Sequence, residues 1–226
     1  MSDYITKEST IIFSPYYNKL INYDLLSLYN KIIFSNYELN NLDDFSEFDF
    51  IGSSFNRPIV LPENLTHITF GEYFNKHVKL PPNLTMITFG QEFNKPIKLP
   101  SNLTKITFGF IFNKPIVLPS NLTEITFGCY FNQPIELPEN LTRITFGYHF
   151  NQKVDFPFGI KYLKLEHDDS HNLDYLPIGI EVLELGFSFN LPLDNLPNSL
   201  LVIKLYKGYK ESLKCIPSKT KIEYKC

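Results

Sequence analysis

A repeat of 19 residues runs through the middle of this 226-residue chain and constrains its fold more than any other feature. Phe-Asn pairs begin at Phe55, Phe74, Phe93, Phe112, Phe131 and Phe150. Leu-Pro pairs keep the same spacing from Leu61 to Leu137. A repeat this short cannot bury its apolar side chains alone, so neighbouring copies must stack and share one core. The period therefore predicts a solenoid.

Each repeat contains the signature of one short strand. Two apolar residues flank a threonine, as in Ile144-Thr145-Phe146, and this alternation is typical of a half-buried strand. The remaining residues are too few for two turns and a helix, and the recurring prolines favour extended or turn-like backbone. We therefore expect a β-rich solenoid of the leucine-rich-repeat type, with one parallel sheet whose strands lie about 4.8 Å apart. Its convex side should contain little helix.

Weaker copies of the repeat extend to both ends. Ile11–Asn18 matches Ile68–Asn75 position for position, and the strand-like segment at Ile32 leads to a Leu-Asn pair at Leu39. No linker or change of composition marks a second domain. We predict a single solenoid over residues 1–226, with degenerate coils or a cap in 1–50, regular repeats in 51–156 and degenerate coils in 157–226. This organisation amounts to about eleven coils and a closing strand.

Three recurring residue types have structural interpretations. The two phenylalanines of each repeat, such as Phe127 and Phe131, should stack between coils as two aromatic columns. The glycine after the first phenylalanine indicates a close approach that a Cβ would obstruct. The asparagine after the second can satisfy backbone groups with its amide, and a solvated turn residue is the alternative. An aspartate lacks the amide's donors, so we expect it to be no better than alanine there. The expected asparagine ladder comprises Asn56, Asn75, Asn94, Asn113, Asn132 and Asn151.

The element Phe-Gly-x-x-Phe-Asn, followed by Pro-Ile and Leu-Pro, resembles the FNIP repeats of amoebae and giant DNA viruses. The resemblance is close over residues 50–151 and degenerate over most of the remainder. It implies a leucine-rich-repeat solenoid with an inward asparagine ladder and a role in protein interaction. Some viral members carry an F-box ahead of the repeats and would act as ubiquitin-ligase adaptors. The first 45 residues of this chain lack the Leu-Pro-x-Glu opening typical of an F-box.

The outward, concave face of the sheet is the expected binding surface. Positions beside and after the inward strand residues vary from copy to copy, so the scaffold does not dictate their side chains. Aromatic and arginine side chains are enriched at protein interfaces. The candidate partner-binding residues are His67, Tyr73, Lys105, Phe110, Glu124, Tyr130, Arg143, Tyr148 and His149. We expect Tyr130, Tyr148 and Arg143 to form one patch, and drift at unconstrained positions is the alternative interpretation of the whole set.

Other features argue against other classes of function. The net charge of −3 offers no general attraction for nucleic acid or anionic lipid. No apolar run approaches the roughly 20 residues that span a bilayer, and the opening residues lack the layout of a signal peptide. Cys129, Cys215 and Cys226 are widely spaced and form neither a disulfide framework nor a metal knuckle. An intracellular location and no nucleic-acid or membrane partner are therefore expected.

No catalytic motif is evident, and no cofactor is expected. The segment His167–His171 contains residue types that bind metals, but a polar loop in a lengthened coil is the preferred interpretation, so no metal site is predicted. The five Asn-x-Thr sequons are interpreted as by-products of the repeat. The predicted function is a non-enzymatic scaffold that binds a host or viral protein through its concave face. The alternatives are a self-assembling structural protein, which would form homo-oligomers, and a ubiquitin-ligase substrate adaptor without a recognisable F-box.

Overall fold

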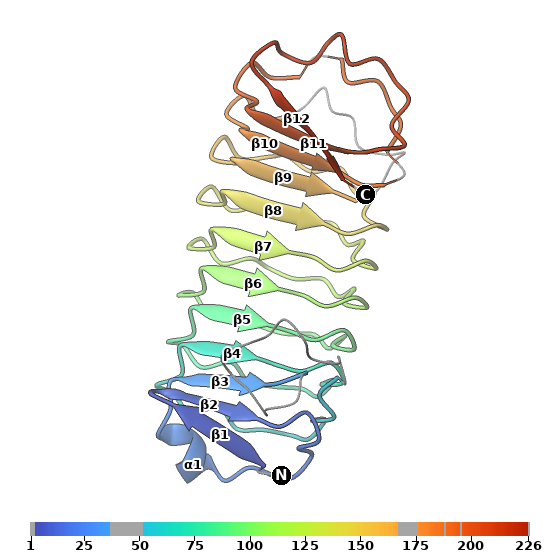
Figure 1. Ribbon diagram of the computed structural model, residues 1–226. Coiled ribbons are helices and arrows are strands. Elements are labelled where there is room, and N and C mark those ends of the chain that lie inside the picture. Colours follow the sequence, from blue (N-terminus) through green and yellow to red (C-terminus); the bar gives the residue numbers. More distant parts are fainter. Residues whose placement is uncertain (1–2, 37–51, 167–175, 188, 195, 226) are drawn as a thin grey trace.

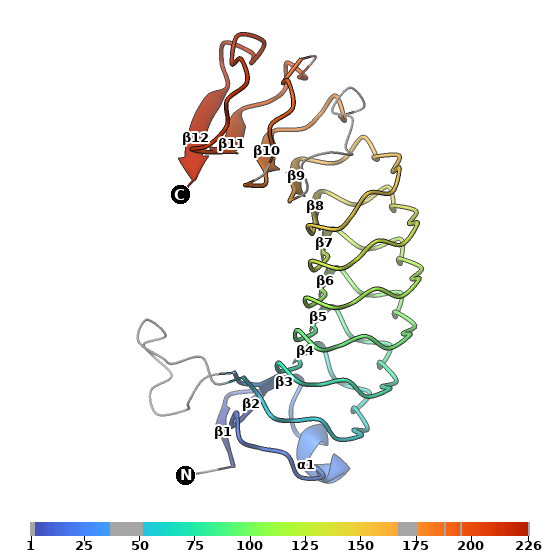
Figure 2. The same cartoon turned by 90° about the vertical axis from the view of Figure 1, so that its right-hand side faces the viewer.

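The computed structural model describes residues 3–36, 52–166, 176–187, 189–194 and 196–225. Over these residues the chain forms an arc-shaped solenoid whose 12-stranded sheet lines the inner side of the arc (Figures 1 and 2). The strand order follows the chain from β1 to β12. The predicted solenoid with a parallel sheet and little helix is confirmed.

The parallel strands are short, and each belongs to one coil. They are β2 (Thr10–Phe13), β3 (Lys31–Phe34), β4 (His67–Thr69), β5 (Met86–Thr88), β6 (Lys105–Thr107), β7 (Glu124–Thr126), β8 (Arg143–Phe146), β9 (Tyr162–Leu165), β10 (Val182–Leu185), β11 (Val202–Tyr206) and β12 (Lys221–Lys225). Ile87 pairs with Ile68 on one side and with Ile106 on the other. Because the repeat length is constant, equivalent residues of neighbouring coils become direct neighbours in the sheet.

The N-terminal end of the solenoid is closed by a strand and a short helix. Strand β1 (Tyr4–Lys7) pairs antiparallel with β2. A short helix α1 (Tyr23–Ser27) begins after Asn22, whose Oδ1 accepts a hydrogen bond from the backbone N–H of Asp24 at 2.8 Å. The helix buries Leu26 against the end of the core. Both elements therefore cover apolar surface that the first coil would otherwise leave open.

The coil that contains β3 differs from the predicted one. Leu39, which was expected to complete it, lies outside the described residues. The ring of Phe55 stacks on Phe34 at a centroid distance of 4.1 Å, close to the spacing within the regular coils. Strand β3 pairs directly with β4. Phe55 therefore completes the coil that β3 begins. Phe34 and Phe55 are 21 positions apart in the sequence, whereas the two phenylalanines of a regular repeat are four apart, so the sequence carries an insertion between them.

The core of the regular coils contains the two predicted columns of phenylalanine, beside buried leucines and isoleucines. Within one coil the rings of Phe127 and Phe131 stack at 3.8 Å between centroids, and the ring of Phe150 in the next coil stacks on Phe131 at 6.0 Å. All three rings are buried. The columns are therefore continuous aromatic stacks along the solenoid, which confirms their predicted role.

The glycine of each repeat stands where two coils almost touch. A Cβ on Gly128 would lie 1.9 Å from the carbonyl oxygen of Gly109, and one on Gly147 would lie 2.1 Å from that of Gly128. No side chain fits at such a distance, so the predicted close approach is confirmed.

Candidate functional site

The recurring asparagines hold neighbouring coils together. Oδ1 of Asn94 accepts a hydrogen bond from the backbone N–H of Asn113 at 3.1 Å, and Oδ1 of Asn113 accepts one from Asn132 at 3.0 Å. The same bond joins the other members of the series, including Asn56, Asn75 and Asn151. The resemblance implied an inward ladder, but these side chains are half-buried and Asn151 is exposed. Since their oxygens serve the backbone, these asparagines do not form a binding surface.

The Asn-x-Thr sequons form two further ladders, one of asparagine and one of threonine, that the sequence analysis did not predict. Nδ2 of Asn121 donates a hydrogen bond to the carbonyl oxygen of Ser101 at 3.0 Å. Two residues further on, the hydroxyl of Thr123 donates to the carbonyl oxygen of Thr104, also at 3.0 Å. Equivalent bonds recur along the regular coils. Both side chains of each sequon therefore form hydrogen bonds with the preceding coil. The unvarying recurrence of the sequon was the signal from which the sequence could have predicted these ladders.

At the start of the strands, the predicted residues form a row in which neighbours interact. The ammonium of Lys105 lies 2.8 Å from a carboxylate oxygen of Glu124. The guanidinium of Arg143 lies 3.4 Å from the centroid of the Tyr162 ring, which is a cation–π contact. Burial, together with the charge of Lys31, lowers the pKa of His67. This edge of the face is polar and internally paired.

At the other end of the strands, aromatic side chains form a continuous row. Successive ring centroids lie 5.2 Å apart for Phe110 and Tyr130, 4.7 Å for Tyr130 and His149, and 5.2 Å for His149 and Tyr148. The row then continues from Tyr148 to Phe187 at 6.0 Å and from Phe187 to Tyr206 at 6.1 Å. We call the six residues Phe110, Tyr130, His149, Tyr148, Phe187 and Tyr206 the aromatic row.

The aromatic row brings together four of the predicted residues and adds two. Phe187 and Tyr206 were missed because they lie in degenerate coils, where the repeat no longer marks equivalent positions. Phe110 is 47% exposed, Tyr130 46% and Phe187 62%, so a large apolar surface faces solvent. Tyr73 is also exposed but lies nearer the N-terminal end, outside the row.

The residues expected to form one patch, Tyr130, Tyr148 and Arg143, do not all lie at the same end of the strands. Arg143 is the first residue of β8, and Tyr148 follows beyond the strand's last residue. At about 3.3 Å per residue, the four residues of β8 alone span roughly 10 Å. Arg143 contacts the ring of Tyr162. That the three residues serve as one binding patch stays a prediction.

A pocket of about 530 Å³ opens on the concave face beside the aromatic row. It is lined by Thr126, Phe127, Gly128, Cys129, Thr145, Gly147, Tyr148, Lys164, Glu166 and Phe187. Gly128 and Gly147 contribute only backbone, and the rings of Tyr148 and Phe187 are nearly parallel, at an interplanar angle of 9°. Burial raises the pKa of the Cys129 thiol. The pocket is mainly apolar, with one lysine and one glutamate at its edge.

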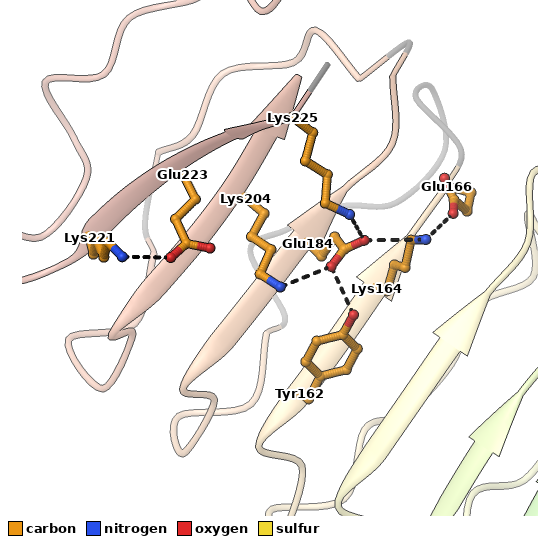
Figure 3. A network of polar contacts seen from close by, with 8 residues as sticks. All are labelled: Tyr162, Lys164, Glu166, Glu184, Lys204, Lys221, Glu223 and Lys225. Carbon is orange, nitrogen blue, oxygen red and sulfur yellow. Dashed lines mark hydrogen bonds and ion pairs between the residues drawn. The ribbon is translucent and has the colours of Figure 1, made fainter. Parts of the chain in front are cut away.

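A buried carboxylate with three lysines lies on the adjoining strands (Figure 3). Glu184 is only 4% exposed. It forms ion pairs with Lys164 at 3.2 Å and Lys204 at 3.5 Å, and it accepts hydrogen bonds from Lys225 and, at 2.9 Å, from the hydroxyl of Tyr162. We call Lys164, Lys204 and Lys225 the lysine cluster. The sequence did not reveal it, because the four strands involved carry their charges at separate places in degenerate coils.

The lysine cluster determines the ionisation of Glu184. Burial alone would raise the pKa of this carboxyl, but hydrogen bonds from Lys225 and Tyr162 and the charge of Lys164 lower it from 4.5 to about 2. Burial and the hydrogen bond to Glu184 raise the pKa of Tyr162 to about 12. Glu184 is therefore a carboxylate and Tyr162 a neutral phenol throughout the physiological range.

The described part of the chain shows neither a metal site nor a membrane span. No group of three or more His, Cys, Asp or Glu side chains in it could hold a metal ion. No helix in it has the length and apolar character needed to cross a membrane. Cys129 and Cys215 have free thiols, whereas Cys226 and the predicted polar loop His167–His171 lie outside the described residues.

Comparison with known proteins identifies the repeat. The FNIP Repeat family matches residues 55–92, 77–111, 93–130, 112–149 and 131–167. The chain is also similar to the crystal structure of CroV588, a giant-virus protein reported as a novel circular LRR protein, with a TM-score of 0.69 and 28% sequence identity. The similarity covers 99% of this chain and 41% of that one, so this chain spans less than half the length of CroV588. A search of curated proteins finds no match.

Proposed function

The chain belongs to the FNIP repeat family, and we propose that it is a non-enzymatic scaffold that binds a protein partner through the concave face of its sheet. A leucine-rich-repeat solenoid suggests a protein-interaction scaffold in general terms. We further propose that the partner is a host or viral protein and that the two proteins meet inside the cell.

The aromatic row supports this proposal best. The phenylalanine, glycine and asparagine columns are explained by the core and by bonds between coils. The aromatic row has no such explanation, because its side chains vary from coil to coil and project from the solenoid. Exposed aromatic groups in one continuous surface are typical of the centre of a protein interface. A surface of this kind at the concave edge therefore favours partner binding there.

Substitution of the aromatic row tests the proposal. A partner would first be captured with the unmodified protein, and its affinity for variants would then be measured. We expect Phe110→Ala and Tyr130→Ala each to weaken binding about 30-fold, since truncating such a residue at an interface costs about 2 kcal/mol. Both side chains are about half exposed, so thermal melting should change little.

Matched controls lie on the turn side of the coils. Ser101→Ala, Ser120→Ala and Glu139→Ala change exposed side chains just after the Leu-Pro turns, and we expect them to leave affinity unchanged. Loss of binding in this control set, with normal binding by the two aromatic variants, would assign the partner to the convex side and refute the proposal.

Self-assembly is a second candidate, favoured by the open ends of the sheet. Within the described residues, β1 and β12 each pair with a strand on one side only. An unpaired strand edge can pair with another chain. Light scattering coupled to size exclusion separates the two candidates, because a mass that rises with concentration in the absence of a partner supports self-assembly.

A further inference from the structure

The concave pocket owes its depth to the glycine column. Gly128 and Gly147 leave its floor without side chains, and in the next coil Glu166 occupies the equivalent position and closes one side. Its aromatic walls, Tyr148 and Phe187, come from two different coils and lean together. The volume of about 530 Å³ lies within the range of pockets that enclose ligand groups, about 300–1,000 Å³. The pocket therefore suits one large apolar group.

The side chains beside the pocket carry a net positive charge. Lys164 lines the pocket and also belongs to the lysine cluster. The charge of Lys204 also acts on Glu223, which pairs with Lys221. Four ammonium groups, including that of Lys221, therefore face the three carboxylates of Glu166, Glu184 and Glu223, which leaves one positive charge in excess. The side chains of the lysine cluster are 25%, 29% and 34% exposed, so they are partly desolvated but still reachable from the concave face.

The cluster also retains hydrogen-bond donors. Each ammonium carries three N–H groups. The contacts described here use two from Lys164, one from Lys204 and one from Lys225, so donors remain on all three lysines. The oxygens of Glu184, in contrast, already accept from these lysines and from Tyr162. An incoming carboxylate would meet free donors and excess positive charge, whereas an incoming cation would meet like charge.

From these contacts we infer that the pocket and the lysine cluster together receive a segment of the partner protein in which an apolar side chain, best an aromatic one, is followed by an acidic residue. The apolar side chain packs in the pocket against Tyr148, Phe187 and Cys129. The carboxylate contacts Lys164 and Lys204. This inference rests on the proposed function and names the chemistry of the partner that the concave face selects.

Two short fluorescent peptides of equal length test the inference directly. One carries the central sequence Phe-Glu-Glu and the other Phe-Lys-Lys, and their binding to the full chain is followed by fluorescence anisotropy. We expect the acidic peptide to bind at least about tenfold more tightly, the effect of one charge-assisted contact. Its advantage should shrink as salt is added, because partly exposed charges are screened. Equal affinity, or preference for the lysine peptide, would overturn the inference.

Variants of the two halves of the site give separate readouts. Phe187→Ala removes an exposed pocket wall and should weaken both peptides. Lys204→Gln should weaken only the acidic peptide, by about tenfold. Lys161→Gln is the matched control, since this exposed lysine pairs with Glu181 outside the cluster. A Lys204→Gln variant that binds the acidic peptide normally would refute the role of the cluster, and Lys225→Gln repeats the test if that variant does not fold.

Cys129 reports occupancy of the pocket. In a chain with Cys215→Ser and Cys226→Ser, alkylation of Cys129 by iodoacetamide should slow when the acidic peptide is bound. Anilinonaphthalenesulfonate, an aromatic anion, serves as a small-molecule probe, and its uncharged relative phenylnaphthylamine is the control. Protection of Cys129 by the dye but by neither peptide would overturn the assignment to a protein segment.

The outcome is separable from that of the proposed function. If the captured partner loses affinity for Tyr130→Ala while the two peptides bind equally, the concave face remains the interface and the inferred partner chemistry is wrong. If the aromatic variants bind the captured partner normally, the proposed function fails irrespective of the peptides.

Discussion

At the scale of single residues, the oxygen of the asparagine amide matters more than its NH2 group. Oδ1 of Asn113 accepts from the backbone N–H of Asn132 at 3.0 Å and from the side chain of Gln133 at 2.9 Å. A backbone N–H can only donate, so the geometry itself requires the oxygen in this place. The expectation that aspartate would be no better than alanine therefore changes, because a carboxylate oxygen can accept the same bonds.

Substitution of Asn113 tests this account. Asn113→Ala leaves the half-buried N–H of Asn132 without its acceptor and should lower the free energy of unfolding by about 1–3 kcal/mol. Asn113→Asp should cost less, because an acceptor remains. The shift in the denaturant midpoint measures both, with Lys114→Ala as the neighbouring surface control. A midpoint for Asn113→Ala equal to that of the control would show that the ladder contributes no stability.

At the scale of secondary-structure elements, the glycine column sets how closely the coils approach. Gly128→Ala would place a Cβ 1.9 Å from a backbone oxygen, which cannot rotate away. We expect a loss of roughly 3 kcal/mol or more, since neighbouring coils must separate to admit it. Gly208→Ala is the matched control, because no atom lies within 4 Å of its added Cβ, and its stability should be nearly unchanged. A similar thermal midpoint for both variants would contradict the close approach.

Glu184, on β10, contacts side chains of three further strands, β9, β11 and β12, and makes the stability of this part of the sheet depend on pH. Its pKa is about 2 in the folded chain and 4.5 ordinarily. A depressed folded-state pKa means that the carboxylate stabilises the fold above pH 4.5, and that this contribution is lost as the pH falls through about 2. The difference corresponds to about 3 kcal/mol. The groups that face Glu184 are Lys164, Lys204, Lys225 and Tyr162.

We expect Glu184→Gln to destabilise the C-terminal coils at neutral pH, because it leaves the lysine cluster without its buried counter-charge. The variant should also lose less stability than the unmodified chain between pH 4.5 and 2. Hydrogen exchange of the backbone amides of β9 to β12 across this range measures both effects, with Glu139→Gln as the exposed control. An unchanged pH profile in Glu184→Gln would refute this role.

At the scale of the whole molecule, the main contacts between strands join neighbours in the sheet, so a lesion acts mostly on adjacent coils rather than on one central core. Phe131→Ala removes a fully buried ring from the middle of the stack and should cost about 3–5 kcal/mol. Phe158→Ala removes a ring that is 83% exposed and should cost less than about 0.5 kcal/mol. Hydrogen exchange in Phe131→Ala should rise first in the coils on either side, and a uniform rise along the chain would contradict the solenoid account.

The regular part of the solenoid could be predicted from the sequence alone. Copies of equal length must place equivalent residues side by side, so the strand register, the stacked rings of Phe127 and Phe146 and the tight approach at Gly128 all follow from the period. Four members of the aromatic row, Phe110, Tyr130, Tyr148 and His149, could be predicted because they lie in regular repeats, where equivalent positions become neighbours. The sequence therefore determined the fold class and the face on which variable side chains gather.

Only the tertiary structure decided what happens where the period fails. Phe55 completes the coil of β3 across an insertion, Phe187 joins the aromatic row, and Lys225 reaches Glu184 from 41 residues away. Once coil lengths vary, sequence distance no longer specifies which residues are neighbours. The contacts of these residues then depend on how each coil packs on the one before it. They also depend on burial, because the buried carboxylate of Glu184 must be paired with cations.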